Sequence, residues 1–120
     1  MATINVEREG ANELPGEGAA ATFTWEDLSE ADVAEAVTFE DFADRSAQVS
    51  GLAGGNAVSI QGSNDGDTWY ELSDPQGNGL LFLADGLKQI VEMTKFIRPE
   101  VLAGAGVLAK VVIFARRGRV

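Results

Sequence analysis

The chain contains neither cysteine nor histidine. The absence of cysteine excludes disulfide bonds, thiolate nucleophiles and cysteine-ligated zinc. The absence of histidine removes the commonest general base and metal ligand near neutral pH, and with it the serine–histidine and histidine–zinc mechanisms. Any catalysis would therefore depend on carboxylate, lysine or tyrosine groups.

Long apolar runs are also missing. No stretch approaches the roughly 20 apolar residues that a membrane-spanning helix requires. The first residues, Met-Ala-Thr-Ile-Asn-Val-Glu-Arg-Glu, lack the basic start and the apolar centre of a secretion signal. We therefore expect a soluble protein that is made in the cytoplasm and has no membrane partner.

Basic residues are scarce in the first part of the chain. Residues 1–50 hold twelve acidic and two basic side chains, which accounts for the whole net charge of −10, whereas residues 51–120 hold seven of each sign. An acidic surface repels phosphate backbones. The only basic cluster (Arg116, Arg117, Arg119) is more typical of a solvated end or of a contact with an acidic neighbouring subunit. The charge distribution thus predicts no nucleic-acid partner.

The length predicts one domain preceded by an arm. The chain has 120 residues, of which 45% are hydrophobic, and this is the size of one domain with one core. Residues 1–20 are expected to form an N-terminal arm, because three glycines and a proline interrupt any regular element there. The arm is either a frayed terminus or an extended segment that orders against a partner through Ile4, Val6 and Leu14. Residues 21–120 are expected to form a single domain.

Short apolar or alternating runs, separated by glycine, proline, asparagine and aspartate, predict strands. The predicted strands cover residues 21–25, 36–42, 47–50, 57–62, 68–73, 80–84, 96–102 and 107–115. Leu87, Ile90 and Val91 have helical spacing and predict one or two helical turns within residues 87–94. An acidic loop over residues 26–35 has room for another turn. The pattern predicts an all-β fold, an antiparallel β-sandwich or jelly-roll-like barrel with one short helical segment.

The clearest turn signal lies within residues 58–72, where Ser-Asn-Asp-Gly-Asp separates two β-rich runs. Glycine accepts positive φ, and asparagine and aspartate tolerate it, so this composition is typical of a hairpin. Asn64, Asp65 and Asp67 also suggest calcium, but that ion takes about six to eight oxygen ligands and the EF-hand spacing is missing. The many acidic residues from Glu26 to Asp44 are typical of a charged exterior rather than of paired catalytic carboxylates. We expect no enzymatic activity, no metal and no cofactor.

Several motifs carry a family resemblance. They are Gln48-Val49-Ser50-Gly51, Gly62-Ser63-Asn64-Asp65-Gly66 with Trp69, Leu72-Ser73-Asp74-Pro75-Gln76-Gly77-Asn78, and Ile97-Arg98-Pro99 ahead of a last apolar strand that closes on Arg116-Arg117. Trp25 followed by Leu28 also fits. Over residues 45–117 the chain resembles the small β-sandwich decoration, or cement, proteins on the capsids of tailed bacteriophages. The loops at 51–57 and 103–107 depart from the family pattern.

The resemblance implies a virion structural protein that coats the outside of the head. Such proteins bind neighbouring major capsid subunits, commonly as homotrimers, and stabilise the shell against the pressure of packaged DNA. The implied partners are the major capsid protein and further copies of the chain. The residues expected to make subunit or capsid contacts are Ile4, Val6, Leu14, Trp25, Leu28, Val112 and Phe114.

Two alternatives remain open. The hairpin with Trp69 also resembles one found in discoidin-type sandwiches, which implies a carbohydrate-binding module with an aromatic platform. Such domains are usually longer and often carry a disulfide bond, which this chain cannot form. The other alternative is a different virion component, such as a tail or connector protein.

Overall fold

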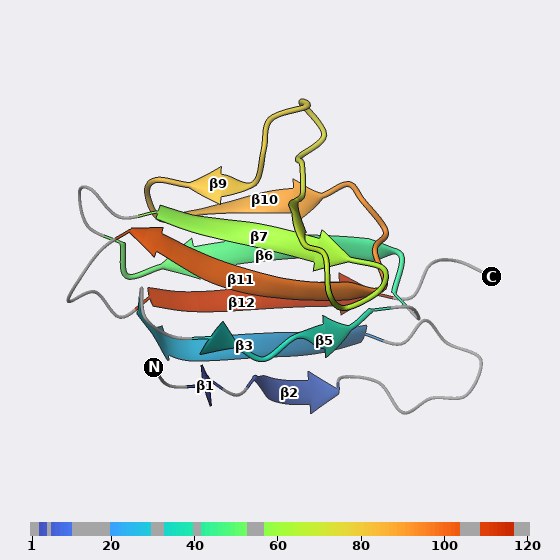
Figure 1. Ribbon diagram of the computed structural model, residues 1–120, viewed down its shortest axis with the longest axis horizontal. Helices are drawn as coiled ribbons and strands as arrows, with labels where there is room; N and C mark the ends of the chain where they lie inside the picture. Colours follow the sequence, from blue (N-terminus) through green and yellow to red (C-terminus); the bar gives the residue numbers. More distant parts are fainter. Residues whose placement is uncertain are drawn as a thin grey trace.

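The structure is a computed structural model, and it describes residues 3–4, 6–10, 20–29, 33–39, 42–52, 57–103 and 109–116. Two antiparallel sheets, each of five strands in this part of the chain, lie face to face as two layers (Figure 1). We name each sheet after its most central long strand. The described residues contain strands but no helix. The all-β sandwich expected from the sequence is therefore confirmed.

The β12 sheet has the strand order β10-β6-β12-β3-β2. Its strands are β2 (Glu7–Gly10), β3 (Ala20–Leu28), β6 (Asp44–Ser50), β10 (Gly86–Ile90) and β12 (Ala109–Arg116). The β11 sheet runs β5-β11-β7-β8, with β9 also paired to β7. Its strands are β5 (Val37–Thr38), β7 (Ala57–Ser63), β8 (Tyr70–Glu71), β9 (Leu81–Phe82) and β11 (Phe96–Ala103). A short parallel pair joins β1 (Thr3–Ile4) to β4 (Val33–Ala34).

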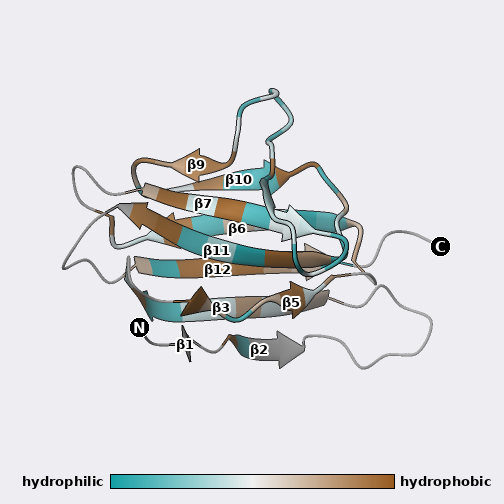
Figure 2. Cartoon of the chain, viewed as in Figure 1, coloured by the Kyte–Doolittle hydropathy of each residue, from teal (hydrophilic) through white to brown (hydrophobic). Residues whose placement is uncertain are grey.

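The core lies between the sheets because alternate side chains of each strand point inward. Along β12, Val111, Ile113 and Ala115 are fully buried while their neighbours are more exposed. The β11 sheet contributes Ile60 and Ile97, and Figure 2 shows hydrophobic and more hydrophilic bands alternating along β7. This alternation is the pattern expected for strands with one face in a core and one face toward the outside.

A β-bulge in β3 changes which residues face the core. Asp27 has a positive φ of 58°, and the pairing with β12 shifts between Ala109 and Val111. Because the bulge inserts an extra residue, Trp25 and Leu28 both point inward, although a regular strand would place them on opposite faces. Both are buried, with exposed fractions of 0% and 2%.

The helical turns expected within residues 87–94 are not present, and that prediction is wrong. Residues 86–90 form β10, which pairs with β6 from Gly86 opposite Val49 to Ile90 opposite Arg45. Three apolar residues at helical spacing also fit a strand, since Ile90 faces the core while Leu87 stays exposed at the sheet margin. Of the strand expected over residues 36–42, the structure describes residues 36–39 and 42, and among these Val37 and Thr38 form β5.

Part of the predicted arm belongs to the sandwich. Residues 7–10 form β2, which pairs with Ala21 to Thr24 and makes the outer strand of the β12 sheet. Residues 11–19, including Leu14, lie outside the described residues.

Gly62 is a position where the sandwich requires glycine. A Cβ atom there would contact Thr94 Oγ1 and would lie 2.7 Å from Leu72 Cδ2. We expect Gly62→Ala to lower the free energy of unfolding by about 1–3 kcal/mol, the usual cost of overpacking. Gly86→Ala is the control, because its Cβ would lie 3.8 Å from the nearest atoms of Phe82, an ordinary contact. Urea titrations of both variants test this, and equal stabilities would contradict it.

Candidate functional site

The hairpin loop between β7 and β8 is fixed by its own side chains. Ser63 Oγ accepts hydrogen bonds from the N–H groups of Asp65 (3.2 Å) and Gly66 (2.9 Å). Asp65 Oδ1 accepts from the N–H groups of Thr68 (2.9 Å) and Asp67 (2.8 Å) and from the Ser63 hydroxyl (2.9 Å). The bond from Thr68, followed by those from Asp67 and Ser63, lowers the pKa of the Asp65 carboxyl. This carboxylate therefore organises the turn.

The hairpin loop is also fastened to the β11 sheet. Asn64 Oδ1 accepts a hydrogen bond from the N–H of Lys95 at 2.9 Å, and the Arg98 guanidinium lies 4.1 Å from the centre of a Trp69 ring. Asn64 and Asp65, considered above as calcium ligands, thus bind separate backbone groups. Within the described ranges, no three acidic side chains form a group that could hold a metal ion.

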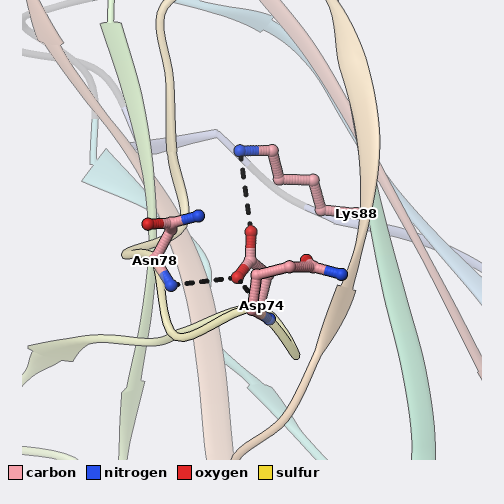
Figure 3. Close-up of polar contacts among 4 residues, drawn as sticks. Asp74, Asn78 and Lys88 are labelled. Carbon is pink, nitrogen blue, oxygen red and sulfur yellow. Dashed lines mark hydrogen bonds and ion pairs between the residues drawn. The ribbon is translucent and has the colours of Figure 1, made fainter.

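A second loop, residues 74–79, is built around Asp74, which is only 5% exposed. Its carboxylate accepts hydrogen bonds from the N–H groups of Gln76 and Asn78, both at 3.0 Å, and lies 3.8 Å from Lys88 Nζ on β10 (Figure 3). Gly77 supplies a positive φ of 88°, which favours glycine. Asp74 thus shapes this loop and links it to the β12 sheet.

Arg45 binds two connections that run from one sheet to the other, at the end of the sandwich where the β7–β8 hairpin loop lies (the hairpin end). It is 3% exposed, and its guanidinium donates to the carbonyls of Phe39 (2.7 Å), Phe42 (3.0 Å) and Glu92 (3.2 Å). Residues 39 and 42 lie between β5 and β6, and residue 92 lies between β10 and β11. Burial lowers the pKa of Arg45, but an arginine remains charged in a protein.

Glu92 connects the same end to the second loop. Its carboxylate accepts hydrogen bonds from the Ser73 N–H (2.7 Å) and the Ser73 hydroxyl (2.6 Å). Burial opposes ionisation of this carboxyl, but the bonds from Ser73 outweigh it and the pKa lies below its ordinary value. The ionised form is therefore the one that holds Ser73.

A hollow of about 520 Å³ opens beside these two loops, lined by residues 62–65, 68, 70–72, 92 and 94. Its three carboxylates, Asp65, Glu71 and Glu92, already accept hydrogen bonds from the hydroxyls of Ser63, Ser59 and Ser73 respectively. Tyr70 stands in its lining and is 70% exposed. The hollow offers hydroxyl, amide and carboxylate groups, which suit a polar ligand better than a reaction that needs an activated nucleophile.

The outer face of the β11 sheet is charged and internally paired. Gln61 Nε2 donates to Glu100 at 2.8 Å, Arg98 Nε donates to Gln61 Oε1 at 3.3 Å, and the Ser59 hydroxyl donates to Glu71 at 3.1 Å. The residues come from β7, β8 and β11, so these contacts hold neighbouring strands together across the sheet.

The outer face of the β12 sheet has a different character. The register aligns one set of outward residues across four strands, and we call this set the β12 face. Its members are Thr22, Thr24, Ser46, Gln48, Leu87, Gln89, Val112 and Phe114. None is charged, and Phe114 at the centre is 45% exposed. Lys110 and the ion pair of Arg116 with Asp44 (2.9 Å) mark the two ends of β12.

The predicted contact residues fall in different places. Val112 and Phe114 lie on the β12 face, and Val6 is half-buried, packs against the core and donates its N–H to Glu35 Oε1 at 2.9 Å. The backbone of Ile4 pairs with Ala34, while its side chain, like all of Leu14, is outside the described part of the chain.

Trp25 and Leu28 do not lie on the surface. Trp25 Nε1 donates to the carbonyl of Glu35 at 2.8 Å, and both side chains belong to the core. Trp25 continues the inward alternation of Ala21 and Phe23, and the bulge at Asp27 turns Leu28 to the same side, which corrects the expectation that these two residues contact another molecule.

The sequence pattern was not used to predict that Arg45 is a buried side chain that bonds to the backbone. A signal for it exists, because Arg45, Ala47 and Val49 alternate along one strand and the last two are apolar. The alternation places the arginine on the inward face, where a charged group must find hydrogen-bond partners.

Comparisons with models of known protein families, with curated proteins and with solved structures found no match for this chain. No helix in the described residues is long and apolar enough to cross a lipid bilayer.

We expect Arg45→Met to lower the free energy of unfolding by about 2–4 kcal/mol, because it leaves up to three carbonyls without their donor at about 1–3 kcal/mol each. Arg116→Met is the matched control, since Arg116 is exposed and its ion pair is worth about 1 kcal/mol or less. Thermal and urea unfolding of both variants test this difference. A loss no greater in Arg45→Met than in Arg116→Met would contradict it.

The lowered pKa values of Asp65 and Glu92 predict weaker folding in acid. Both carboxyls bind protons less readily in the folded state than at their ordinary pKa of about 3.9 and 4.3. Their contribution is therefore present above about pH 4.3 and is lost as the pH falls through the lowered values. We expect the urea midpoint of the wild-type protein to decrease as the pH is lowered through this range. Glu92→Gln should show a smaller decrease, whereas Glu26→Gln, at an exposed residue, is the control and should show the same decrease as the wild type. An unaltered pH dependence in Glu92→Gln would speak against the Ser73 contact.

Proposed function

We propose that this protein is a virion structural protein, a decoration or cement subunit that binds the outer surface of the major capsid protein shell of a tailed bacteriophage. In this role it stabilises the head and needs no chemical reaction. It is made in the host cytoplasm and ends on the capsid exterior, with the major capsid protein and further copies of itself as partners.

One observation carries the proposal beyond the sequence resemblance. Two aspartates of the motifs use their carboxylates to fix their own loops: Asp65 holds the hairpin loop and Asp74 holds the second loop. Loops that are rigid before binding lose little conformational entropy when they contact a partner. Such loops favour a subunit that binds a fixed, repeated surface over a catalyst whose groups must act on a substrate.

The symmetry of a capsid adds to this argument. A decoration subunit that associates with its own copies presents several binding surfaces at once, so weak contacts combine into stable attachment. We expect a homotrimer, as the resemblance implies.

The direct experiment mixes the purified protein with expanded heads of the phage that encodes it and separates bound from free protein by sedimentation. Saturable binding and a higher melting temperature of the heads are expected, with no binding to double-stranded DNA. Failure to bind the heads would overturn the proposal. Binding to oligosaccharides that is lost in Tyr70→Ala, without binding to heads, would favour the carbohydrate-binding alternative at the hollow.

Two variants sharpen this experiment. Asp65→Ala removes the carboxylate that orders the hairpin loop, whereas Asp67→Ala makes the same charge change at an exposed residue of that loop. We expect Asp65→Ala to weaken head binding several-fold and Asp67→Ala to leave it near the wild-type value. Equal binding by both variants would show that the order of this loop does not contribute.

A further inference from the structure

The two outer faces of the sandwich differ in a way that folding does not require. On the β11 sheet, Arg98, Glu100 and Glu71 form a charged, internally bonded surface. The β12 face carries threonine, serine and glutamine around Val112 and Phe114, with no charged member, while Glu7 of β2, which pairs with Thr24, stands at its margin. In a chain with a net charge of −10, a sheet face with an uncharged centre of this kind is a distinct feature.

The composition of the β12 face is that of a protein–protein interface. The centre of such interfaces is depleted in charged residues and enriched in aromatic ones, with polar groups around them. Phe114 is 45% exposed at a central strand, and Leu87, 65% exposed, extends the apolar surface toward the β10 margin. Large exposed apolar side chains that share one sheet face with uncharged neighbours mark a contact surface.

The β12 face and the charged margin around it are together large enough for a specific contact. The β12 sheet has five strands about 4.8 Å apart when its outer strand β2 is included, and the seven residues of β6 at about 3.3 Å each set its length, so its outer side measures roughly 24 by 23 Å. A contact that covers this side on one copy and an equal area on its neighbour buries about 1,000 Å², which reaches the lower limit for a specific interface.

We infer that the β12 face is the surface through which copies of this chain bind one another. A second copy fits it because two chains of the same net charge approach most easily through a surface that has no charge at its centre. The margins carry both signs, with Lys110 at one end, Asp44 with Arg116 at the other and Glu7 on the outer strand β2, so charged groups of neighbouring copies can pair at the rim. The inference deepens the proposed function, on which its role in the virion rests, by naming the self-contact surface.

Sedimentation equilibrium of the purified full chain tests the inference without capsids. We expect the wild-type protein to sediment as an oligomer of the 12.7 kDa chain and Phe114→Lys to weaken self-association by at least about thirtyfold, as for a central interface residue. Leu102→Lys is the matched control, since Leu102 is 46% exposed on the β11 sheet and the charge change is the same. It should sediment like the wild type.

A second variant separates loss of contact from loss of folding. Gln48→Lys lies next to Val112 on the same face and is exposed, so it should also dissociate the oligomer while circular dichroism and the urea midpoint stay near wild-type values. A monomeric wild type at about 100 µM, or oligomers that survive both Phe114→Lys and Gln48→Lys, would overturn the inference. Capsid binding is measured separately, so heads bound by a monomer would refute the self-contact and leave the proposed function standing.

Discussion

The buried charge of Arg45 is the constraint on which the hairpin end of the molecule depends. A guanidinium removed from water must have its N–H groups satisfied, and here backbone carbonyls on both inter-sheet connections accept them. The two connections also bond to each other, because the N–H of Phe39 donates to the carbonyl of Lys95 at 2.7 Å. Glu92 extends the network to Ser73, and Asn64 joins it through Lys95. The Arg45 guanidinium thus holds the two connections between the sheets in place, and through Glu92 and Lys95 it is linked to the starts of the second loop and of the hairpin loop.

The fixed frame has consequences for both outer faces. Because the connections hold the layers in register, each sheet keeps one face in the core and presents the other outward (Figure 1). The β11 sheet closes its outer face with its own polar contacts, whereas the β12 face leaves Phe114 exposed at its centre. A rigid body with ordered loops and one sheet face that is uncharged at its centre is suited to repeated structural contacts, which is the physical basis of the proposed role in a capsid.

The sequence predicts local features well and the long-range ones poorly. Strand alternation and turn composition predict the hairpin at Asn64 to Asp67 and the long strands β3, β6, β7, β11 and β12. They do not reveal that a bulge turns Leu28 to the same side as Trp25, because a single inserted residue changes the face without changing the composition. The partners of Arg45 are likewise hidden, since Glu92 lies 47 positions away and is brought near only by the fold. The β12 face emerges only when strands from distant segments are placed side by side.

Native-state hydrogen exchange tests the central role of the Arg45 network most directly. The amides of Phe39 and Val91 lie in connecting segments but donate to the carbonyls of Lys95 and Ser73. If the network makes these segments part of the frame, their exchange free energies will match those of core amides such as that of Val111, and all will fall together in denaturant. Exchange of Phe39 and Val91 at rates typical of exposed loops, while Val111 stays protected, would contradict the account.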